Sequence, residues 1–363
     1  MAKPRIFIFA PVHRMGASDH AYDILEQAGC DILYGSASWH TPQGNNEDDM
    51  CSMAGGADAL TGGSIKSSPI TGKIMDSAPN LRIIAKCSIG VDDVDVDAAT
   101  ERGILVTHGP TESNWSGVAE GAFAILLTLL KKIRERDEFV KKGGWRDPSL
   151  QGASIGRHRD GYPGITVGIV GLGRIGKRFA DLLAPWRVRI LACDPYVRES
   201  EFIRCNAERV DLKTLLRESD VVNLHCALTR ETHHLLGGEQ FATIKKGAVL
   251  INTARGPVVD TNALIEALQN DRIAAAGLDV FEEEPLKPDS ALLKMGHKVL
   301  LSPHMASSNL DGGLKQGIIW ANQSVLAAID GKVPEHVYNK EVIPRWLERF
   351  GGRRVFADIR KSL

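Results

Sequence analysis

The stretch TVGIVGLGRIGKRF, residues 166–179, decides the fold of this chain. A β-branched run ends at Val170, and Gly171, Gly173 and Gly176 follow where a helix can begin. In such a strand–turn–helix the first glycine allows the tight turn, and the second lets the backbone approach a pyrophosphate. The third lets the helix pack closely on the strand, and the first helical turn presents N–H groups to phosphates. The stretch therefore predicts a dinucleotide-binding unit.

An acidic residue at the end of the next strand completes this pattern. It is expected about 20 positions after the glycines, and Asp194 stands there, directly after the apolar run 189–193. Its carboxylate can accept hydrogen bonds from both ribose hydroxyls, and it would repel a 2′-phosphate. NAD is therefore expected rather than NADP, with Arg198 as the neighbour that could favour NADP instead. A glycine-rich turn beside an unrelated aspartate is the alternative interpretation.

Short β-branched runs alternate with amphipathic stretches on both sides of this unit, which is typical of parallel sheets built from strand–helix–strand units. Ahead of the glycines, strands are expected at 5–10, 31–34, 57–60, 81–85 and 104–107, with a helix at 17–28 and a polar connection at 45–63. After them, strands are expected at 165–170, 189–193, 221–224, 248–252, 275–278 and 299–302, with helices at 174–183 and about 310–329. The basic tail after Arg345 is expected to be partly disordered.

Composition and charge narrow the class of protein. The chain has 363 residues, which at about 150 residues per domain predicts two domains. Its 44 basic and 45 acidic residues give a net charge of −1, which excludes the basic excess of a nucleic-acid-binding protein. No apolar run approaches the roughly 20 residues of a membrane span. Six scattered cysteines without a CxxC pair indicate reduced thiols and a cytoplasmic location.

Arg255, Glu284 and His304 each follow an expected strand, at the edge where open α/β sheets build their sites. An arginine, a carboxylate and a histidine so placed suit redox chemistry between a carbonyl and an alcohol. The arginine can fork onto a carboxylate and a carbonyl oxygen, the histidine can move the proton, and the glutamate can orient the histidine. Taken singly, a helix cap, a solvated acid or a core histidine would explain each residue. Their order after the dinucleotide turn favours an active site.

With these residues, the chain resembles the D-isomer-specific 2-hydroxyacid dehydrogenase family from about Ala57 to about Ala327. The segment SIGVDDVD, residues 88–95, is similar to the family's substrate loop. The segment Val118-Ala119-Glu120 resembles the start of the helix that crosses between the family's two domains. The family includes phosphoglycerate dehydrogenase, glyoxylate/hydroxypyruvate reductase and D-lactate dehydrogenase.

The resemblance implies a fold, a reaction and a set of site residues. The fold has two Rossmann-like, doubly wound parallel-sheet domains: a discontinuous substrate domain at 1–112 and 309–363, and an NAD-binding domain at 113–308. The reaction is hydride transfer between NAD(H) and a small D-2-hydroxy acid or 2-oxo acid, with no metal. Arg255 then binds the substrate, His304 is the acid/base and Glu284 is its partner. The backbone of Ser88, Ile89 and Gly90 holds the substrate carboxylate. The implied cofactor contacts are Gly171, Gly173, Arg174, Ile175, Gly176, Asp194, Cys226, Thr253, Ala254, Arg255, Asp279 and His304.

Three positions depart from the family's usual pattern. Ser88 stands in place of a glycine, Gly121 in place of a frequent histidine, and His108-Gly109-Pro110 in place of Asn-Thr-Pro. All three lie toward the substrate or interdomain side, so they bear on the choice of substrate more than on the reaction class. His13, Arg14 and Trp115 are further candidates for substrate selectivity or are plain surface residues.

A second class of function shares this architecture. The corepressors called C-terminal binding proteins keep the arginine, glutamate and histidine and act as NAD-bound dimers that dock other proteins. The segment 224–235 resembles theirs too. The lack of long disordered extensions favours the enzyme. Formate dehydrogenase is disfavoured, since that relative uses glutamine where this chain has Glu284.

The apolar stretch 118–133 predicts contact with a second subunit. A helix that is apolar all round must be covered on several faces. One face can pack on its own domain, and the resemblance implies that the equivalent helix of another subunit covers the rest. We therefore expect a homodimer formed through the cofactor domain, which Leu126→Asp should dissociate or unfold. Coverage by the substrate domain alone is the alternative.

Overall fold

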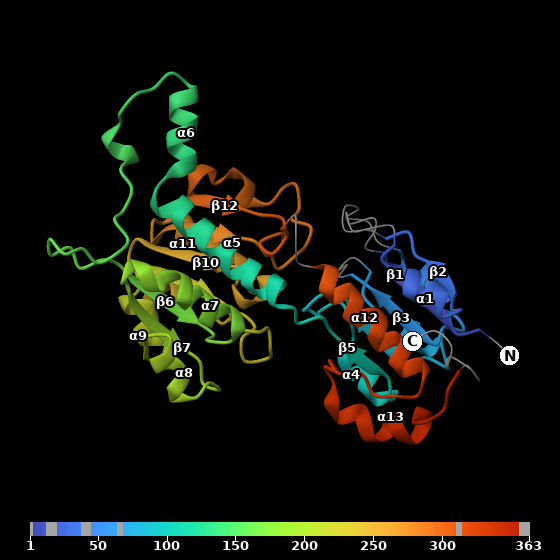
Figure 1. The fold of residues 1–363 in the computed structure, drawn as a ribbon. Helices are drawn as coiled ribbons and strands as arrows, with labels where there is room; N and C mark the ends of the chain where they lie inside the picture. The colour runs from blue at the N-terminus through green and yellow to red at the C-terminus, as the bar shows by residue number, and fades with distance from the viewer. Residues whose placement is uncertain (1–2, 12–19, 38–44, 64–67, 310–313, 356–363) are drawn as a thin grey trace. The chain divides into compact units, whose positions relative to one another are not determined.

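The computed structural model describes residues 3–11, 20–37, 45–63, 68–309 and 314–355. The chain forms two compact units. The first unit comprises residues 1–114 and 309–363, and the second comprises 115–308. Each unit is built on one wholly parallel sheet flanked by helices (Figure 1), which confirms the predicted α/β class. His13 and Arg14 lie outside the described residues.

The first sheet has five strands in the order β2-β1-β3-β4-β5, which is the flavodoxin-like order. Because alternate side chains of a strand point to opposite faces, Ile6 and Ile8 pack in one core while Phe7 and Phe9 pack in the other. The strands are β1 Arg5–Ala10, β2 Asp31–Tyr34, β3 Ala59–Gly62, β4 Ile83–Lys86 and β5 Leu105–Thr107. The helices are α1 Asp23–Gln27, α2 Glu47–Ala54, α3 Gly72–Asp76, α4 Val96–Glu101, α12 Leu314–Ile329 and α13 Ile343–Phe350.

The second sheet has seven strands in the order β12-β11-β10-β9-β6-β7-β8. The chain order reverses between β6 and β9, and in open α/β sheets ligands bind at the carboxyl ends of the strands at such a switch point. The strands are β6 Thr166–Val170, β7 Arg189–Cys193, β8 Ala207–Arg209, β9 Val221–Leu224, β10 Ala248–Asn252, β11 Ile273–Leu278 and β12 Val299–Leu301. The helices are α6 Ile133–Lys141, α7 Arg174–Leu183, α8 Glu199–Arg204, α9 Leu212–Glu218, α10 Gly238–Thr243 and α11 Thr261–Gln269.

The long apolar helix differs from its prediction at both ends. It is α5, Glu112–Leu130, and it begins six residues earlier than Val118. It ends because Lys132 adopts a left-handed backbone with φ of 51°, after which α6 begins. Leu126 is fully buried in the core of the second unit. Leu126→Asp is therefore expected to unfold the unit and cannot report on assembly.

One further prediction was wrong. The polar connection at 45–63 contains α2, which Asn46 caps by accepting a hydrogen bond from the Asp49 N–H at 2.8 Å. After Arg345 the described residues continue to Val355, and α13 buries Trp346 completely in the core on one face of the first sheet. Residues 356–363 lie outside the described part of the chain.

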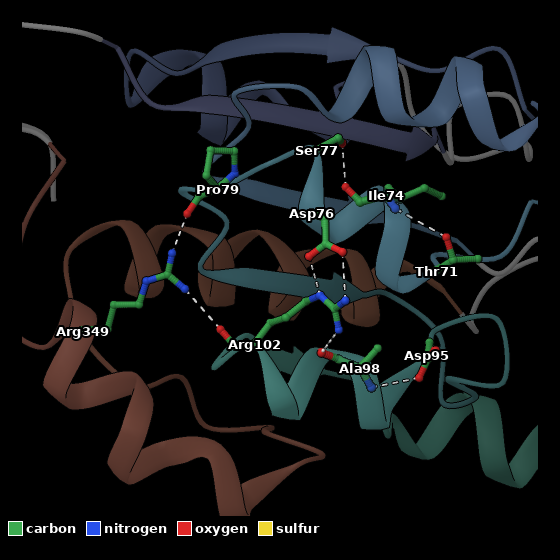
Figure 2. A network of polar contacts seen from close by, with 9 residues as sticks. All are labelled: Thr71, Ile74, Asp76, Ser77, Pro79, Asp95, Ala98, Arg102 and Arg349. Carbon is green, nitrogen blue, oxygen red and sulfur yellow. Dashed lines mark hydrogen bonds and ion pairs between the residues drawn. The ribbon is translucent and has the colours of Figure 1, made fainter.

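Charged side chains fasten α13 to the first unit (Figure 2). The Arg102 guanidinium donates to both carboxylate oxygens of Asp76, at 2.7 and 2.9 Å. This hydrogen bond lowers the pKa of Asp76. Arg349, on α13, donates to the backbone carbonyls of Arg102 and Pro79. The network therefore joins α3, α4 and α13.

Candidate active site

The glycine-rich turn between β6 and α7 has the geometry that the sequence predicts. Gly171 has a φ of 91°, and a Cβ there would lie 2.6 Å from the Cys226 nitrogen. A Cβ on Gly176 would lie 2.1 Å from the Gly171 carbonyl oxygen. Both glycines are thus required by contacts within the protein itself.

Gly173 is different, because a Cβ there would meet no protein atom within 4 Å. This residue caps the ten-residue helix α7 without a side-chain hydrogen bond. Arg174 is exposed and makes no ion pair with the described residues. An open, cationic helix N-terminus of this kind fits a pyrophosphate. Half-buried Ile175 follows in the first turn.

Asp194 follows β7 and reaches back to the glycine-rich turn. Its Oδ2 accepts a hydrogen bond from the Leu172 N–H at 2.8 Å, and its Oδ1 accepts from the Tyr196 N–H at 2.9 Å. A carboxylate has about four acceptor sites, so these two contacts leave acceptor capacity for ribose hydroxyls. Asp194 is therefore fixed beside the turn in an orientation compatible with its predicted role.

Cys226 and Thr253 follow the neighbouring strands β9 and β10. Burial raises the pKa of the Cys226 thiol to about 11, so this side chain is a neutral, apolar wall. The Thr253 hydroxyl is buried and has no hydrogen-bond partner among the described residues. Buried polar groups seldom stay unpaired, so this hydroxyl is available for a hydrogen bond to a bound group. These residues, with the open helix N-terminus, fit a dinucleotide.

Arg255 stands in a turn after β10 that one asparagine shapes. The Asn252 amide donates to the Arg255 carbonyl at 3.0 Å and accepts from the Ala254 N–H at 3.0 Å. A Cβ on Gly256 would lie 1.9 Å from the Phe281 carbonyl oxygen. The turn is therefore pressed against the segment that follows β11, which carries Glu284.

His304 and Glu284 form a direct pair. His304 Nδ1 lies 2.9 Å from Glu284 Oε2, and Glu284 Oε1 accepts a hydrogen bond from the Phe281 N–H at 3.0 Å. The Glu284 side chain is 13% exposed and that of His304 is 36% exposed, so the carboxylate is largely covered while the imidazole is partly open to solvent. Since β12, β11 and β10 are parallel neighbours, the segments carrying His304, Glu284 and Arg255 leave the sheet at one edge.

Asp279 supports the turn that carries His304. Its carbonyl accepts from the His304 N–H at 2.8 Å, and its carboxylate oxygens accept from the backbone N–H groups of Met305 and Ala306 at 2.9 and 3.0 Å. The side chain is buried. The family resemblance implied Asp279 as a cofactor contact, and the sequence gave no sign of these bonds, which depend on how the turn folds back.

The predicted substrate loop lies in the first unit, directly after β4. Gly109 N–H donates to the Ser88 carbonyl at 2.9 Å, and His108 Nδ1 lies 3.2 Å from the Ile89 carbonyl oxygen. Lys86, the last residue of β4, and Asp93, within the loop, are both buried and form an ion pair of 2.5 Å. Sequence reasoning missed this pair, for which the available signal was a lysine at the end of an apolar run with Asp92 and Asp93 six and seven residues later.

Comparisons with known proteins identify the family. A family model described as "D-isomer specific 2-hydroxyacid dehydrogenase, NAD binding domain" matches residues 123–306. A glyoxylate reductase of Thermofilum pendens is 37% identical over 348 residues, which cover 94% of this chain and 96% of that protein. The chain belongs to the D-isomer specific 2-hydroxyacid dehydrogenase family. The predicted family, the reaction class of NAD-linked hydride transfer on 2-hydroxy and 2-oxo acids, and the cofactor NAD are thereby confirmed.

Two further similarities place this 2-hydroxyacid dehydrogenase among its relatives. A D-3-phosphoglycerate dehydrogenase of Archaeoglobus fulgidus is 38% identical over 256 residues, which cover 70% of this chain and 47% of that protein. The crystal structure of a D-lactate dehydrogenase of Aquifex aeolicus with NAD and lactic acid has a TM-score of 0.76 and 28% identity. The alignment covers 94% of this chain and 98% of that one.

None of the described helices is long and apolar enough to cross a membrane. No group of three or more histidine, cysteine, aspartate or glutamate side chains in the described ranges could hold a metal ion.

Proposed function

We propose that His304, Glu284 and Arg255 carry the hydride-transfer reaction of this dehydrogenase, with His304 as the acid/base. The observation that carries this assignment is the 2.9 Å contact between His304 Nδ1 and Glu284 Oε2. The pair lies at the same sheet edge as the turn of Arg255, in the order that the sequence predicts.

The Glu284 carboxylate determines which ring nitrogen of His304 can work. A carboxylate accepts hydrogen bonds, so Nδ1 carries the hydrogen that faces Glu284 and Nε2 exchanges a proton with the substrate. In reduction, His304 gives this proton to the carbonyl oxygen of a 2-oxo acid, and in oxidation it takes a proton from the hydroxyl. Arg255 stabilises the charge that develops on that oxygen. NAD(H), when bound, accepts or supplies the hydride.

We also propose which residues hold the cofactor. Gly171, Gly173, Arg174, Ile175 and Gly176 receive the pyrophosphate at the N-terminus of α7. Asp194 accepts from the adenosine ribose, with Cys226 beside the adenine. Thr253, Ala254 and Asp279, together with Arg255 and His304, lie toward the nicotinamide.

A small 2-oxo acid is the proposed substrate, with its carboxylate received by Arg255 and by the backbone of Ser88, Ile89 and Gly90. Glyoxylate is the first candidate, because a relative that matches 94% of this chain is a glyoxylate reductase. The structure solved with lactic acid supports pyruvate as the second candidate.

The test is NADH oxidation with glyoxylate, hydroxypyruvate, pyruvate and phenylpyruvate, each repeated with NADPH. We expect turnover of at least one acid at about 1–10³ s⁻¹, the usual range for enzymes. Binding of NADH without turnover of any of these acids would instead support a scaffold of the corepressor kind.

We further propose a homodimer that forms through the second unit. Figure 1 shows α6 and the loop after it extending away from the sheet of this unit. Large apolar side chains on this arm are exposed: Ile133 at 51%, Val140 at 55% and Trp145 at 75%. Exposed apolar patches of this kind mark interaction sites, and closed two-fold pairing is the commonest arrangement among oligomers.

A cytoplasmic location is proposed as well. All six cysteines are free thiols, as expected of a reducing compartment. Cell fractionation with a tagged full-length chain tests this directly, and recovery in a membrane or secreted fraction would contradict it.

A further inference from the structure

The segment that connects β4 to the rest of the first unit is held at both ends. Lys86 and Asp93 flank it, and their side chains are 0% and 3% exposed. Besides the carboxylate, the Lys86 ammonium donates to the Gly63 carbonyl at 2.7 Å. An ion pair so completely removed from water keeps its geometry only when its hydrogen bonds are well satisfied. The base of the segment 87–92 is therefore fixed.

The middle of the same segment is held through its carbonyl groups. The Gly109 N–H donates to the Ser88 carbonyl at 2.9 Å. His108 Nδ1 lies 3.2 Å from the Ile89 carbonyl oxygen, and because a carbonyl can only accept, Nδ1 carries the hydrogen. Two consecutive peptide groups are thus bound by two consecutive residues of the segment after β5.

Because the peptide group is planar, these two hydrogen bonds also fix the directions of the N–H groups of Ile89 and Gly90. In a planar trans peptide the C=O and the N–H point in opposite directions. Fixing the Ser88 carbonyl therefore directs the Ile89 N–H away from residues 108–109, and fixing the Ile89 carbonyl directs the Gly90 N–H away from them too. Successive N–H groups oriented by the backbone form an anion-binding concavity.

We propose that His108 is a positioning residue for substrate binding: by donating from Nδ1 to the Ile89 carbonyl, it orients the Gly90 N–H toward the substrate carboxylate. This inference rests on the proposed function, in which the segment 88–90 receives that carboxylate. In this role His108 acts through the peptide group and not on the reacting atoms.

The surroundings of His108 keep its ring in place. Its backbone N–H donates to the His336 carbonyl at 3.2 Å. Its ring packs edge-on against Tyr338, with 5.5 Å between ring centroids and 78° between planes. The ring therefore loses little further freedom when it bonds to Ile89, which favours a persistent contact.

The test compares His108→Leu, His108→Asn and His336→Leu in steady-state reduction of the best 2-oxo acid found for the wild type. Leucine keeps the bulk and removes the donor. Asparagine places a donor, Nδ2, the same number of bonds from the backbone as histidine Nδ1. His336 is the matched control, because it contacts this region through its backbone carbonyl and its ring packs on Trp320.

We expect His108→Leu to raise the KM for the 2-oxo acid about 3- to 10-fold, the usual effect of one lost hydrogen bond. Its kcat and its KM for NADH should stay within twofold of the wild type. His108→Asn should restore the KM for the acid, and His336→Leu should not change it. Urea unfolding of each variant verifies the fold.

Three results would overturn the inference: an unchanged KM in His108→Leu, an equal loss in His108→Asn, or parallel losses in kcat and in NADH affinity. Failure of the proposed function is distinguishable from these, because the wild type itself would then reduce no 2-oxo acid.

Discussion

His304 reaches its position through two carboxylates that act on different parts of it. Glu284 contacts the ring, while the Asp279 carboxylate accepts hydrogen bonds from the backbone N–H groups of Met305 and Ala306, which follow His304. The backbone of His304 has a φ of 56°, a conformation that is uncommon outside glycine. Such a residue costs of order 1–3 kcal/mol, and the three bonds to Asp279 offset that cost. These bonds therefore hold the strained turn in place, and the turn sets the direction of the His304 imidazole.

Cofactor choice should depend on the charge of Asp194. Asp194→Asn keeps an acceptor oxygen near the Leu172 N–H and removes the negative charge that repels a 2′-phosphate. We expect the NADPH-to-NADH ratio of kcat/KM to rise about tenfold, corresponding to roughly 1.4 kcal/mol of repulsion removed. Steady-state kinetics with both cofactors measure it. An unchanged ratio would show that Asp194 does not face the 2′ position.

The buried pair of Lys86 and Asp93 should be costly to break from one side. Lys86→Met leaves the Asp93 carboxylate buried without its cation, which typically costs about 3–5 kcal/mol of unfolding free energy. The double variant Lys86→Met, Asp93→Leu should recover most of that loss. Urea unfolding of the three proteins checks this, and a single variant as stable as the wild type would refute it.

At the scale of elements, a strand or helix could be predicted from the sequence when most of its side chains are buried. Buried parallel strands are continuous apolar runs, so every predicted strand is present within two residues of its expected bounds. Strand β8 was missed because the sequence Ala207–Arg209 is short, polar and at the sheet edge. Helix α13 was missed because its basic residues make the sequence look solvent-exposed, although one side chain, Trp346, is fully buried.

In the candidate site, too, some features could be predicted from the sequence and others could not. Residues placed by strand ends, such as Asp194 and His304, could be predicted from their positions in the chain. The contacts of Asp279 and His108 could not, because they depend on turns that fold back over long sequence distances. Periodicity and motif spacing carry no information about such turns.

The end of β9 should make stability depend on pH. His225 follows this strand and packs against Phe179 of α7, with both ring nitrogens lacking partners among the described residues. Burial lowers the pKa of His225 to about 3. The folded state thus favours the neutral ring. The contribution of His225 to the free energy of unfolding is therefore fully present above its unfolded pKa near 6.5. It is lost as pH falls toward 3, because the unfolded state then binds a proton that the folded state does not.

Urea unfolding between pH 7 and pH 4 tests this contribution. We expect the free energy of unfolding to fall less steeply with acid in His225→Leu than in the wild type. The variant should be at least as stable at pH 7, because it removes two buried, unsatisfied nitrogens. Identical acid dependence in the two proteins would exclude His225 as the cause.

At the scale of the whole molecule, the arm formed by α6 and Trp145 exposes large apolar side chains, and we expect a second copy of the chain to cover them. We expect light scattering at micromolar concentration to give twice the 39.5 kDa mass of one chain. Val140→Glu combined with Trp145→Ser should lower the mass to that of one chain and leave the circular dichroism unchanged, because both side chains are exposed. A folded wild type with the mass of a single chain would refute the homodimer.

The most direct test of the account is the kcat for glyoxylate reduction by His304→Gln, measured beside the wild type with NADH affinity determined on the same samples. A positioned acid/base contributes about 10²- to 10⁴-fold, so we predict a loss of that size in kcat with NADH affinity unchanged. A kcat within threefold of the wild type would contradict the assignment of His304 and, with it, the proposed chemistry of the site.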